Sequence, residues 1–337
     1  MTDQETGMET AIAIGARPGQ SALMIRNGHD RIPAIISREG EKATRRFVEF
    51  FTANIRNRNT REAYARASVR FLDWCERGGI GLPQIEPVVV AAYIEKMTQD
   101  RNAQTVKQHL AAIRMLFDWL VVGQVLPMNP ATSVRGPSYS YKRGKTPVLS
   151  APDTRKLLDS IDTSHVVGLR DRALIALMVY SFARVGAVTR MLVSDYYPNG
   201  KTWWIRLHEK GGKFHEVPVH HNAEAYIDAY IEMAGIADDK KSPLFRSVKG
   251  RTKTLTENPV HPTNVLMMIK RRAKEAGLPD NICCHTFRAT GITTYLENGG
   301  SVEHAQQIAA HESPRTTKLY DRRNDQISLD EIERILI

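Results

Sequence analysis

Four residues near the carboxyl end have the types and the spacing of a site that acts on a phosphate. His285 and Arg288 lie three positions apart, so on a helix they share one face and can converge on a single anion. An arginine presents a fixed fork of donors that matches phosphate oxygens, and a histidine can add a hydrogen bond and move a proton near neutral pH. His311 and Tyr320 follow, nine residues apart. We interpret Tyr320 as the group that attacks.

Two cations earlier in the chain extend this set. The pattern predicts a strongly apolar helix over residues 171–182, and Arg184 stands where the apolar run breaks. β-forming segments at 202–207 and 214–219 flank the turn-forming Lys210-Gly211-Gly212-Lys213, which predicts a β-hairpin with lysines at its tip. Lys210 and Lys213 remain alternatives, because the pattern does not show which of them points inward.

The charge of the chain indicates a polyanionic partner. Its 337 residues are enough for two domains with real cores, and 42% of them are hydrophobic. The formal net charge of +10 favours nucleic acid over an acidic small substrate, with a basic surface that has no specific partner as the alternative. The chain has no long apolar run and no basic start typical of a signal peptide. We therefore expect a cytoplasmic protein.

Metal binding is the main competitor for the same part of the chain. The side chains that a zinc site would use are Cys283, Cys284, His285, His208, His215, His220 and His221. Adjacent cysteines without a C-x-x-C pair do not present a tetrahedral set of ligands, and adjacent cysteines rarely pair as a disulfide. We therefore predict neither a zinc site nor a disulfide, and the total of three cysteines suits a reducing compartment.

Residues 36–134 have the apolar spacing of a small helical bundle, after a loosely ordered leader over residues 1–35. We predict helices around residues 47–51, from a cap at Asn59 to Gly78, from Pro87, and over residues 106–120. The aromatic residues recur at the inward period, which favours a core over a platform for stacking bases.

Basic side chains on the other faces of this bundle are candidate contacts for DNA phosphates, with simple solvation as the alternative for each. The candidates are Arg56, Arg58, Arg61, Arg66, Lys107 and Arg114. Residues 135–148 read as a basic linker, in which Lys142, Arg143 and Lys145 could follow a duplex backbone. An ordinary spacer that happens to be positive explains the linker equally well.

Residues 149–337 form the second predicted domain. Ser150 and Asp153 open a helix as cap and first-turn acid, and further helices are predicted over residues 222–235, 262–276, 286–297 and 302–310. The chain ends in an apolar segment that could dock on a neighbouring protomer or fold onto its own domain. Its apolar residues are Leu329, Ile332, Ile335, Leu336 and Ile337.

Taken in order, these residues resemble the tyrosine recombinases, the phage integrase family of site-specific DNA recombinases. The resemblance covers about residues 40–325 and rests on four segments. They are the Asn59-Thr60-Arg61-x-x-Tyr64 helix, the first arginine box at Arg184-Val185-Gly186-Ala187-Val188, the second at His285-Thr286-Phe287-Arg288, and the run from Ala310 to Tyr320. It implies a mainly α fold with a small β-sheet, in which an N-terminal helical core-binding domain precedes an α+β catalytic domain.

Two positions depart from the family pattern. Ala187 stands where the family commonly has Glu after the first arginine; that residue is usually structural, so its replacement affects the support of Arg184 but not its role. Ala310 replaces a usual Gly before the histidine, a change that we expect to cost little.

The resemblance implies one role for each catalytic residue. Tyr320 attacks the scissile phosphate, which Arg184 and Arg288 hold and neutralise. Lys210 donates a proton to the departing 5′-hydroxyl, and the family's placement of its lysine before the turn favours Lys210 over Lys213. His285 assists the proton of the tyrosine, and His311 hydrogen-bonds the phosphate. A 3′-phosphotyrosine link results, and neither ATP nor a metal or other cofactor is required.

The same resemblance implies the partners. They are double-stranded DNA with inverted-repeat core sites and further protomers of a tetramer, with a second recombinase or an accessory DNA-bending protein as possible additions, in a bacterial cytoplasm. The roles of such enzymes include phage or transposon integration, excision, transposition and cointegrate resolution. Two alternatives use related features: a type IB topoisomerase-like enzyme that relaxes DNA, and a DNA-binding protein without catalysis.

Overall fold

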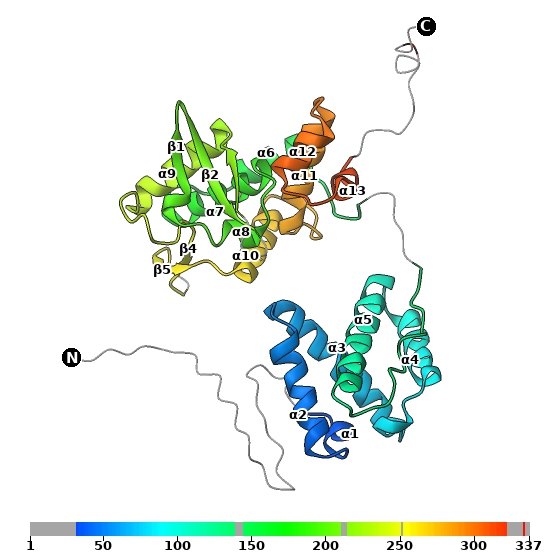
Figure 1. Cartoon of the computed structure of the whole chain (residues 1–337). Helices are drawn as coiled ribbons and strands as arrows, with labels where there is room; N and C mark the ends of the chain where they lie inside the picture. The colour runs from blue at the N-terminus through cyan, green and yellow to red at the C-terminus, as the bar shows by residue number, and fades with distance from the viewer. Residues whose placement is uncertain (1–31, 139–143, 210–213, 251, 322–332, 334–337) are drawn as a thin grey trace, which may run out of the picture. The chain divides into compact units, whose positions relative to one another are not determined.

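The computed structural model describes residues 32–138, 144–209, 214–250, 252–321 and 333, and these fold as two compact units (Figure 1). The described residues of the first unit lie within residues 1–140, and those of the second unit lie within residues 141–337. Helices dominate both units, as predicted, and the strands are short. Among the described helices, none combines the length and the apolar character needed to cross a membrane.

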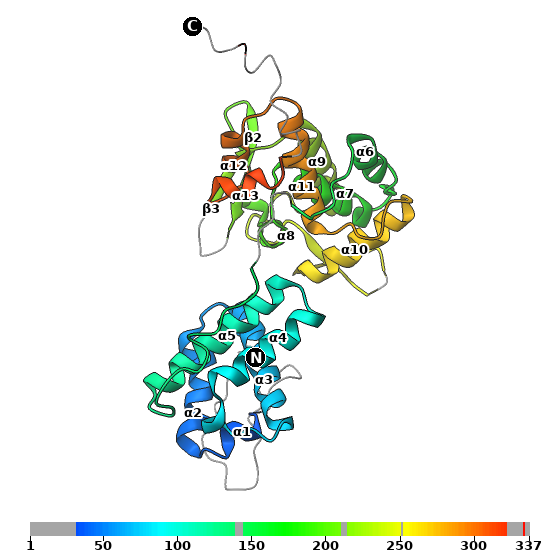
Figure 2. The ribbon, with the colours of Figure 1, turned by 90° about the vertical axis from the view of Figure 1, so that its right-hand side faces the viewer.

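The first unit is helical throughout its described part (Figure 2). Its helices are α1 (Ala34–Ser37), α2 (Glu41–Glu49), a π-helical turn (Phe50–Asn54), α3 (Arg58–Arg77), a 3₁₀ turn (Leu82–Gln84), α4 (Pro87–Asp100) and α5 (Ala103–Val122). The predicted aromatic core is confirmed: Phe71 is fully buried and meets Tyr93 and Phe117 edge to face, with ring centroids 5.0 and 6.1 Å apart.

Asparagine side chains begin the two long helices of this unit. Asn57 Oδ1 accepts from the backbone N–H of Thr60 at 3.1 Å, and Asn102 does the same for Thr105 at 2.9 Å. The prediction that Asn59 caps the second helix is wrong. The backbone is extended at Asn57 and already helical from Arg58, so Asn59 lies within the first turn.

The second unit combines helices with two small sheets. Its helices are α6 (Ala151–Asp159), α7 (Val166–Tyr180), α8 (Val185–Val188), a 3₁₀ turn (Val193–Asp195), α9 (His221–Ala234), α10 (Pro262–Glu275), α11 (Cys284–Glu297), α12 (Val302–Ile308) and α13 (Pro314–Lys318). Its strands are β1 (Tyr196–Asn199), β2 (Thr202–His208), β3 (Phe214–Pro218), β4 (Arg246–Val248) and β5 (Leu255–Pro259).

Helix α7 is the centre of the second unit. Nearly every residue from Val167 to Val179 is buried, and α9 and α11 lie against it. Because almost the whole circumference of this helix is buried, α7 brings the surrounding elements together. It begins five residues before the predicted start because the His165 side chain caps it, with Nδ1 accepting from the Gly168 N–H at 3.0 Å.

The predicted hairpin is confirmed as β2 and β3, which pair antiparallel with Ile205 opposite Val217. Strand β1 adds to the other edge of β2 and completes a three-stranded sheet. The two-stranded sheet of β4 and β5 was not predicted, because its short strands carry partly or fully exposed residues and lack an alternating apolar pattern.

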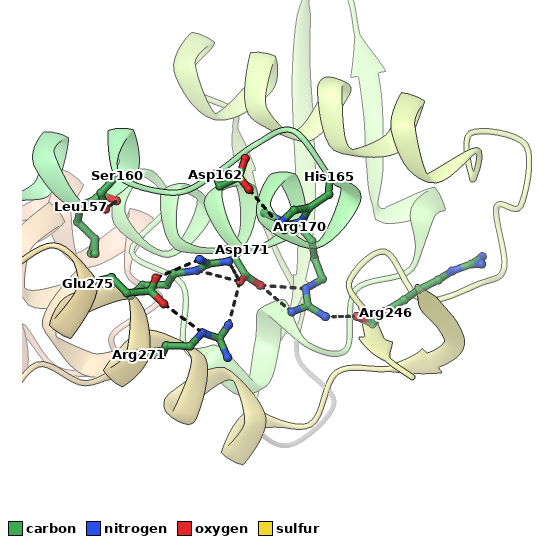
Figure 3. Close-up of polar contacts among 11 residues, drawn as sticks. Leu157, Ser160, Asp162, His165, Arg170, Asp171, Arg246, Arg271 and Glu275 are labelled. Carbon is green, nitrogen blue, oxygen red and sulfur yellow. Dashed lines mark hydrogen bonds and ion pairs between the residues drawn. The ribbon is translucent and has the colours of Figure 1, made fainter. Parts of the chain in front are cut away.

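A buried ion cluster ties α7 to α10 (Figure 3). The fully buried Asp171 carboxylate accepts from Arg170 Nη2 at 2.6 Å and from Arg272 Nη2 at 2.8 Å. Arg271 approaches the same carboxylate at 3.5 Å, and Arg170 also donates to the carbonyl oxygen of Arg246 at 2.8 Å. Every charge at the centre of this cluster therefore has a partner.

Several predictions concern residues outside the described part of the chain. These are the leader up to residue 31, the linker residues Lys142 and Arg143, the hairpin-tip residues Lys210 and Lys213, and the apolar end residues Leu329, Ile332, Ile335, Leu336 and Ile337.

Candidate active site

Arg184 stands at the junction between α7 and α8. The chain leaves α7 after Tyr180, turns at Phe182 with a φ of 55°, and presents Arg184 directly before the first residue of α8. The Arg184 side chain is 41% exposed, and its Nη1 donates to the Glu209 carboxylate at 2.7 Å. Arg184 is thus anchored at one nitrogen while its side chain remains partly exposed.

Helix α11 brings Arg288 to the same junction. Gly291 makes this approach possible, because a Cβ there would lie 2.0 Å from the carbonyl oxygen of Val179 in α7. The Arg288 side chain donates to the carbonyl oxygen of Phe182 through Nη1 and to that of Ala309 through Nη2, the latter at 2.6 Å. The residue is only 2% exposed. Two neutral carbonyls therefore fix a buried positive charge.

The electrostatics of Arg288 reflect its neighbours. Burial, together with the positive charge of Arg184, lowers the pKa of Arg288 to about 10. The nearby Tyr320 and Glu209 act in the opposite direction and raise this pKa. Arg288 stays protonated at neutral pH, so two cationic guanidiniums share a small volume that can take an anion.

His311 follows α12 after a turn at Ala310, whose φ of 47° lies in the left-handed region. The His311 backbone N–H donates to the carbonyl oxygen of Gln306 at 3.1 Å, and its ring Nδ1 lies 2.8 Å from the hydroxyl oxygen of Thr317. Burial, followed by the charges of Arg288 and Arg184, lowers the pKa of His311 to about 3. The ring is therefore neutral at pH 7.

Tyr320 lies two residues after the end of α13 and is held on two sides. Its N–H donates to the carbonyl oxygen of Thr317 at 2.9 Å, and its own carbonyl oxygen accepts from the Thr293 hydroxyl of α11 at 2.9 Å. The Tyr320 ring is nearly parallel to that of His311, with centroids 5.9 Å apart. These contacts keep the phenol beside Arg288, whose pKa it raises.

His285 lies one turn before Arg288 on α11, where its side chain is exposed at the surface. Partial loss of hydration, followed by the charges of Arg288 and Arg184, lowers its pKa from the ordinary value. A neutral imidazole at pH 7 can accept a proton. The structure therefore brings five of the six predicted residues together: Arg184, His285, Arg288, His311 and Tyr320.

The sixth predicted residue, Lys210, and its alternative Lys213 lie outside the described residues, but both flanking strands are near this site. At the end of β2, Glu209 contacts Arg184. At the start of β3, the His215 ring nitrogen Nε2 lies 2.9 Å from the carbonyl oxygen of Ile308 in α12.

The histidines considered for zinc have other partners. His208 Nε2 lies 3.0 Å from Asp195 Oδ2, His215 contacts a backbone carbonyl, and His220 stacks on Tyr180 with centroids 4.1 Å apart. Within the described part of the chain, no group of three or more His, Cys, Asp or Glu side chains is arranged to hold a metal ion.

The candidate DNA contacts of the first unit divide into two groups. Arg61 and Arg114 donate to backbone carbonyls, Arg61 to Ile55 at 2.9 Å and Arg114 to Ala131 at 3.1 Å, so both support the fold. The other candidates expose their side chains; they are Arg56, Arg58, Arg66 and Lys107, with Arg58 paired to Glu62, and Lys145 of the linker is exposed as well.

Sequence reasoning missed three contributors to this site. Thr293 and Thr317 position Tyr320 and His311, and Glu209 holds Arg184. Only Glu209 left a signal in the sequence, because it is a carboxylate next to a predicted catalytic lysine. The two threonines are ordinary helix residues whose contacts depend on how α11 and α13 meet.

Comparisons with known proteins agree with this geometry. The phage integrase family model matches residues 147–326, and the N-terminal SAM-like domain of phage integrases matches residues 46–123. Tyrosine recombinase XerD of Listeria monocytogenes serotype 4b (strain F2365) is 26% identical over 271 residues, which are 78% of this chain and 87% of that protein. Tyrosine recombinase XerC of Leptospira interrogans serovar Lai is 23% identical and covers 86% and 91%.

Solved structures share the fold at low sequence identity. A lambda integrase dimer bound to a COC′ core site matches with a TM-score of 0.65 and 19% identity, covering 90% of this chain and 85% of that one. The XerH recombinase in its pre-cleavage complex with difH matches with a TM-score of 0.63 and 16% identity, covering 90% and 94%. With its catalytic family model matched over more than half its length, the chain belongs to the phage integrase family, the tyrosine recombinases that cleave and rejoin DNA strands.

Proposed function

We propose that this chain recombines DNA at specific sites through a covalent bond between Tyr320 and a DNA 3′-phosphate. The proposal rests on one observation. Arg184, Arg288 and Tyr320 come from three separate segments of the chain and surround one positively charged volume. The two guanidiniums can neutralise the non-bridging oxygens of a phosphodiester and stabilise the added charge of its pentacoordinate transition state.

The residues that can accept and donate protons at this site support an in-line displacement at phosphorus. The Tyr320 oxygen attacks phosphorus, and the bond from phosphorus to the 5′-oxygen breaks. The neutral imidazole of His285 takes the phenolic proton of Tyr320. Lys210 supplies the proton that the departing 5′-oxygen needs. The resulting phosphotyrosine ester keeps the energy of the broken link, so attack by another 5′-hydroxyl reverses the step and restores the tyrosine.

His311 has a separate part in this proposal. Its lowered pKa keeps it neutral, so it acts through a hydrogen bond and not through a charge. When Nδ1 accepts from the Thr317 hydroxyl, the ring proton lies on Nε2, and that nitrogen can donate to the phosphate.

The DNA partner is a pair of duplex sites, and exchange between them needs several protomers. Two solved structures of similar fold support this assembly: one is a lambda integrase dimer on a core site, and another is a lambda integrase tetramer bound to a Holliday junction. We assign phosphate contacts to the exposed basic residues Arg56, Arg66, Lys107 and Lys145. We place the protein in the bacterial cytoplasm with its DNA.

Trapping of the covalent intermediate tests the proposal. Wild-type protein is incubated with a randomly nicked library of the genomic DNA of its source organism, and adducts that survive denaturation are isolated and sequenced. We expect adducts at a small set of sequences with inverted repeats, and none with Tyr320→Phe, which lacks only the phenolic oxygen and should still bind these sequences. An adduct formed by Tyr320→Phe would refute the assignment of the nucleophile.

A second measurement separates recombination from DNA relaxation. Supercoiled plasmids that carry two copies, one copy or no copy of the captured sequence are compared. Recombinant product should appear only with paired sites. Efficient relaxation of the plasmid without a site would instead favour a topoisomerase.

A further inference from the structure

The side chain that orients Arg184 does not come from α8, the helix that Arg184 directly precedes. A phosphate-binding guanidinium works best when its fork is held in one orientation before the anion arrives. In α8, the position three residues after Arg184 is Ala187, which is 1% exposed and has no polar atom in its side chain. An orienting partner for Arg184 must therefore come from another element.

Glu209 has the position and the burial for this task. Its Oε2 lies 2.7 Å from Arg184 Nη1, a distance typical of a strong charge-assisted hydrogen bond. The Glu209 side chain is only 10% exposed, whereas that of Arg184 is 41% exposed. The carboxylate thus approaches the arginine from the protein side, and the guanidinium has five N–H donors, of which this contact uses one.

The chain is anchored immediately before Glu209, at the last residue of β2. The His208 carbonyl oxygen accepts from Arg190 Nη2 at 2.6 Å, and the His208 ring lies 3.0 Å from Asp195 Oδ2. Arg190 follows α8 closely in the chain, so the same two segments that carry Arg184 and Glu209 are joined by a second contact. Glu209 is therefore held in place by the fold.

The carboxylate also reduces the repulsion between the two arginines. Arg184 lowers the pKa of the buried Arg288, and Glu209 acts against this by raising it. Arg288 itself donates to two backbone carbonyls. A negative charge on the protein side of Arg184 makes it easier to keep both cations close together while no DNA is bound.

We propose that Glu209 is a positioning residue for the reaction: it orients Arg184 from the protein side and leaves the other N–H donors of this partly exposed side chain to the scissile phosphate. This inference deepens the proposed function and rests on it, because Arg184 must act on a phosphate. Glu209 contacts neither the phosphate nor the attacking oxygen. Glu209 thus orients Arg184 from a distant position in the sequence, which Ala187 cannot do because its side chain has no polar atom.

The test compares Glu209→Gln with Glu216→Gln on the same hairpin. Glu216 forms an ion pair of similar length with Arg206, at 2.8 Å, but both side chains are about 40% exposed and neither contacts Arg184. The rate of covalent adduct formation is measured at saturating concentrations of a nicked duplex with the captured sequence. We expect Glu209→Gln to slow this rate about 10- to 100-fold, with DNA affinity changed less than about threefold, and Glu216→Gln to match the wild type.

Two further variants separate positioning from a general structural effect. Glu209→Asp keeps the carboxylate and should recover part of the lost rate. In the background of Arg184→Ala, Glu209→Gln should cause no additional loss, because the residue through which it acts is gone. An undiminished additional loss in that background would overturn the proposal.

The rate of adduct formation by Glu209→Gln and by the wild type also tests the positioning role of Glu209. If Glu209→Gln forms adducts as fast as the wild type, Glu209 does not position Arg184, although the proposed function stands. If it forms them faster, the carboxylate competes with the phosphate for Arg184, and the proposal is equally wrong. Failure of the wild type itself to form any adduct would count against the proposed function and not against Glu209 alone.

Discussion

The second unit contains two groups of arginines that differ in how their charges are balanced. Around Asp171, three arginines share one buried carboxylate, and Glu275 accepts from Arg272 as well (Figure 3). In the candidate active site, the side chain of Arg288 donates to two neutral backbone carbonyls, and within the described part of the chain the carboxylate that pairs with Arg184 is that of Glu209.

This difference distinguishes arginines that stabilise the fold from arginines that are available to bind an anion. A buried charge is tolerated when partners compensate for its lost hydration, and Asp171 receives this compensation from both sides. The bonds of Arg288 to the backbone are to neutral carbonyls, and the nearby Glu209 and Tyr320 offset burial only in part, so the pKa of Arg288 stays lowered to about 10. A phosphate would remove this imbalance, which is why the second group is suited to binding and the first to stability.

Loss of the central acid should have the largest effect on stability. Asp171→Asn keeps the shape of the side chain but leaves buried arginines without their counterion, so we expect the free energy of unfolding to fall by about 3–5 kcal/mol. Chemical denaturation measures this change. Asp239→Asn is the matched control, because its ion pair with Arg246 has an acid that is 57% exposed, and the expected loss is under about 1 kcal/mol. Equal losses in the two variants would contradict the comparison.

In the active site, the expected defect concerns rate. Arg288→Lys keeps a positive charge but replaces the fork with a single point, so it cannot serve two carbonyls and a phosphate at once. We expect adduct formation to slow at least about 100-fold. Circular dichroism of the variant provides the folding control. A rate within about threefold of the wild type would show that the guanidinium geometry does not matter.

Acid should destabilise the second unit through His311. In the unfolded chain this histidine binds a proton below about pH 6.5, whereas in the folded protein it does so only near pH 3. Stability is therefore full above the unfolded pKa and declines as pH falls, by about 1.4 kcal/mol per pH unit at most. His311→Gln lacks this titration, so its unfolding free energy should decline less between pH 6.5 and 4.5. Parallel pH curves for the two proteins would refute the assignment.

The smallest expected effect concerns the turn before His311. Ala310 adopts a φ of 47°, which costs a residue with a Cβ about 1–2 kcal/mol, so the substitution of the family's usual glycine costs more than the sequence suggested. Ala310→Gly should raise the free energy of unfolding by about 0.5–1 kcal/mol, after allowance for the greater entropy of glycine in the unfolded chain. Ala309→Gly, at a right-handed position, should lower it. A loss of stability from Ala310→Gly would contradict the backbone assignment.

Most of the fold followed from local patterns. Pro87 predicted the start of α4, an apolar stripe predicted α5, and a strongly apolar run predicted α7. The Ser150 cap predicted the start of α6, where Ser150 Oγ accepts from the Asp153 N–H at 3.1 Å. The errors have local causes too. Asn57 and Asn59 are both good caps two residues apart, and only the backbone conformation of Asn57 decides between them.

The active site could be predicted as a set of residues but not as an arrangement. Motif order pointed to Arg184, Arg288 and Tyr320, because the chemistry restricts which residue types can serve. The contacts that hold them cross between distant segments: Thr293 binds the carbonyl of Tyr320, and Glu209 binds Arg184. Such contacts depend on tertiary packing, which local spacing does not encode.

The most direct test identifies the residue that carries the DNA. Covalent complexes trapped from the wild type with the captured nicked duplex are digested with nuclease and protease, and the modified peptide is sequenced by mass spectrometry. We predict a nucleotide attached through its 3′-phosphate to Tyr320. Attachment to any other residue, such as Tyr295, would contradict the central claim that the two guanidiniums activate a phosphate for attack by Tyr320.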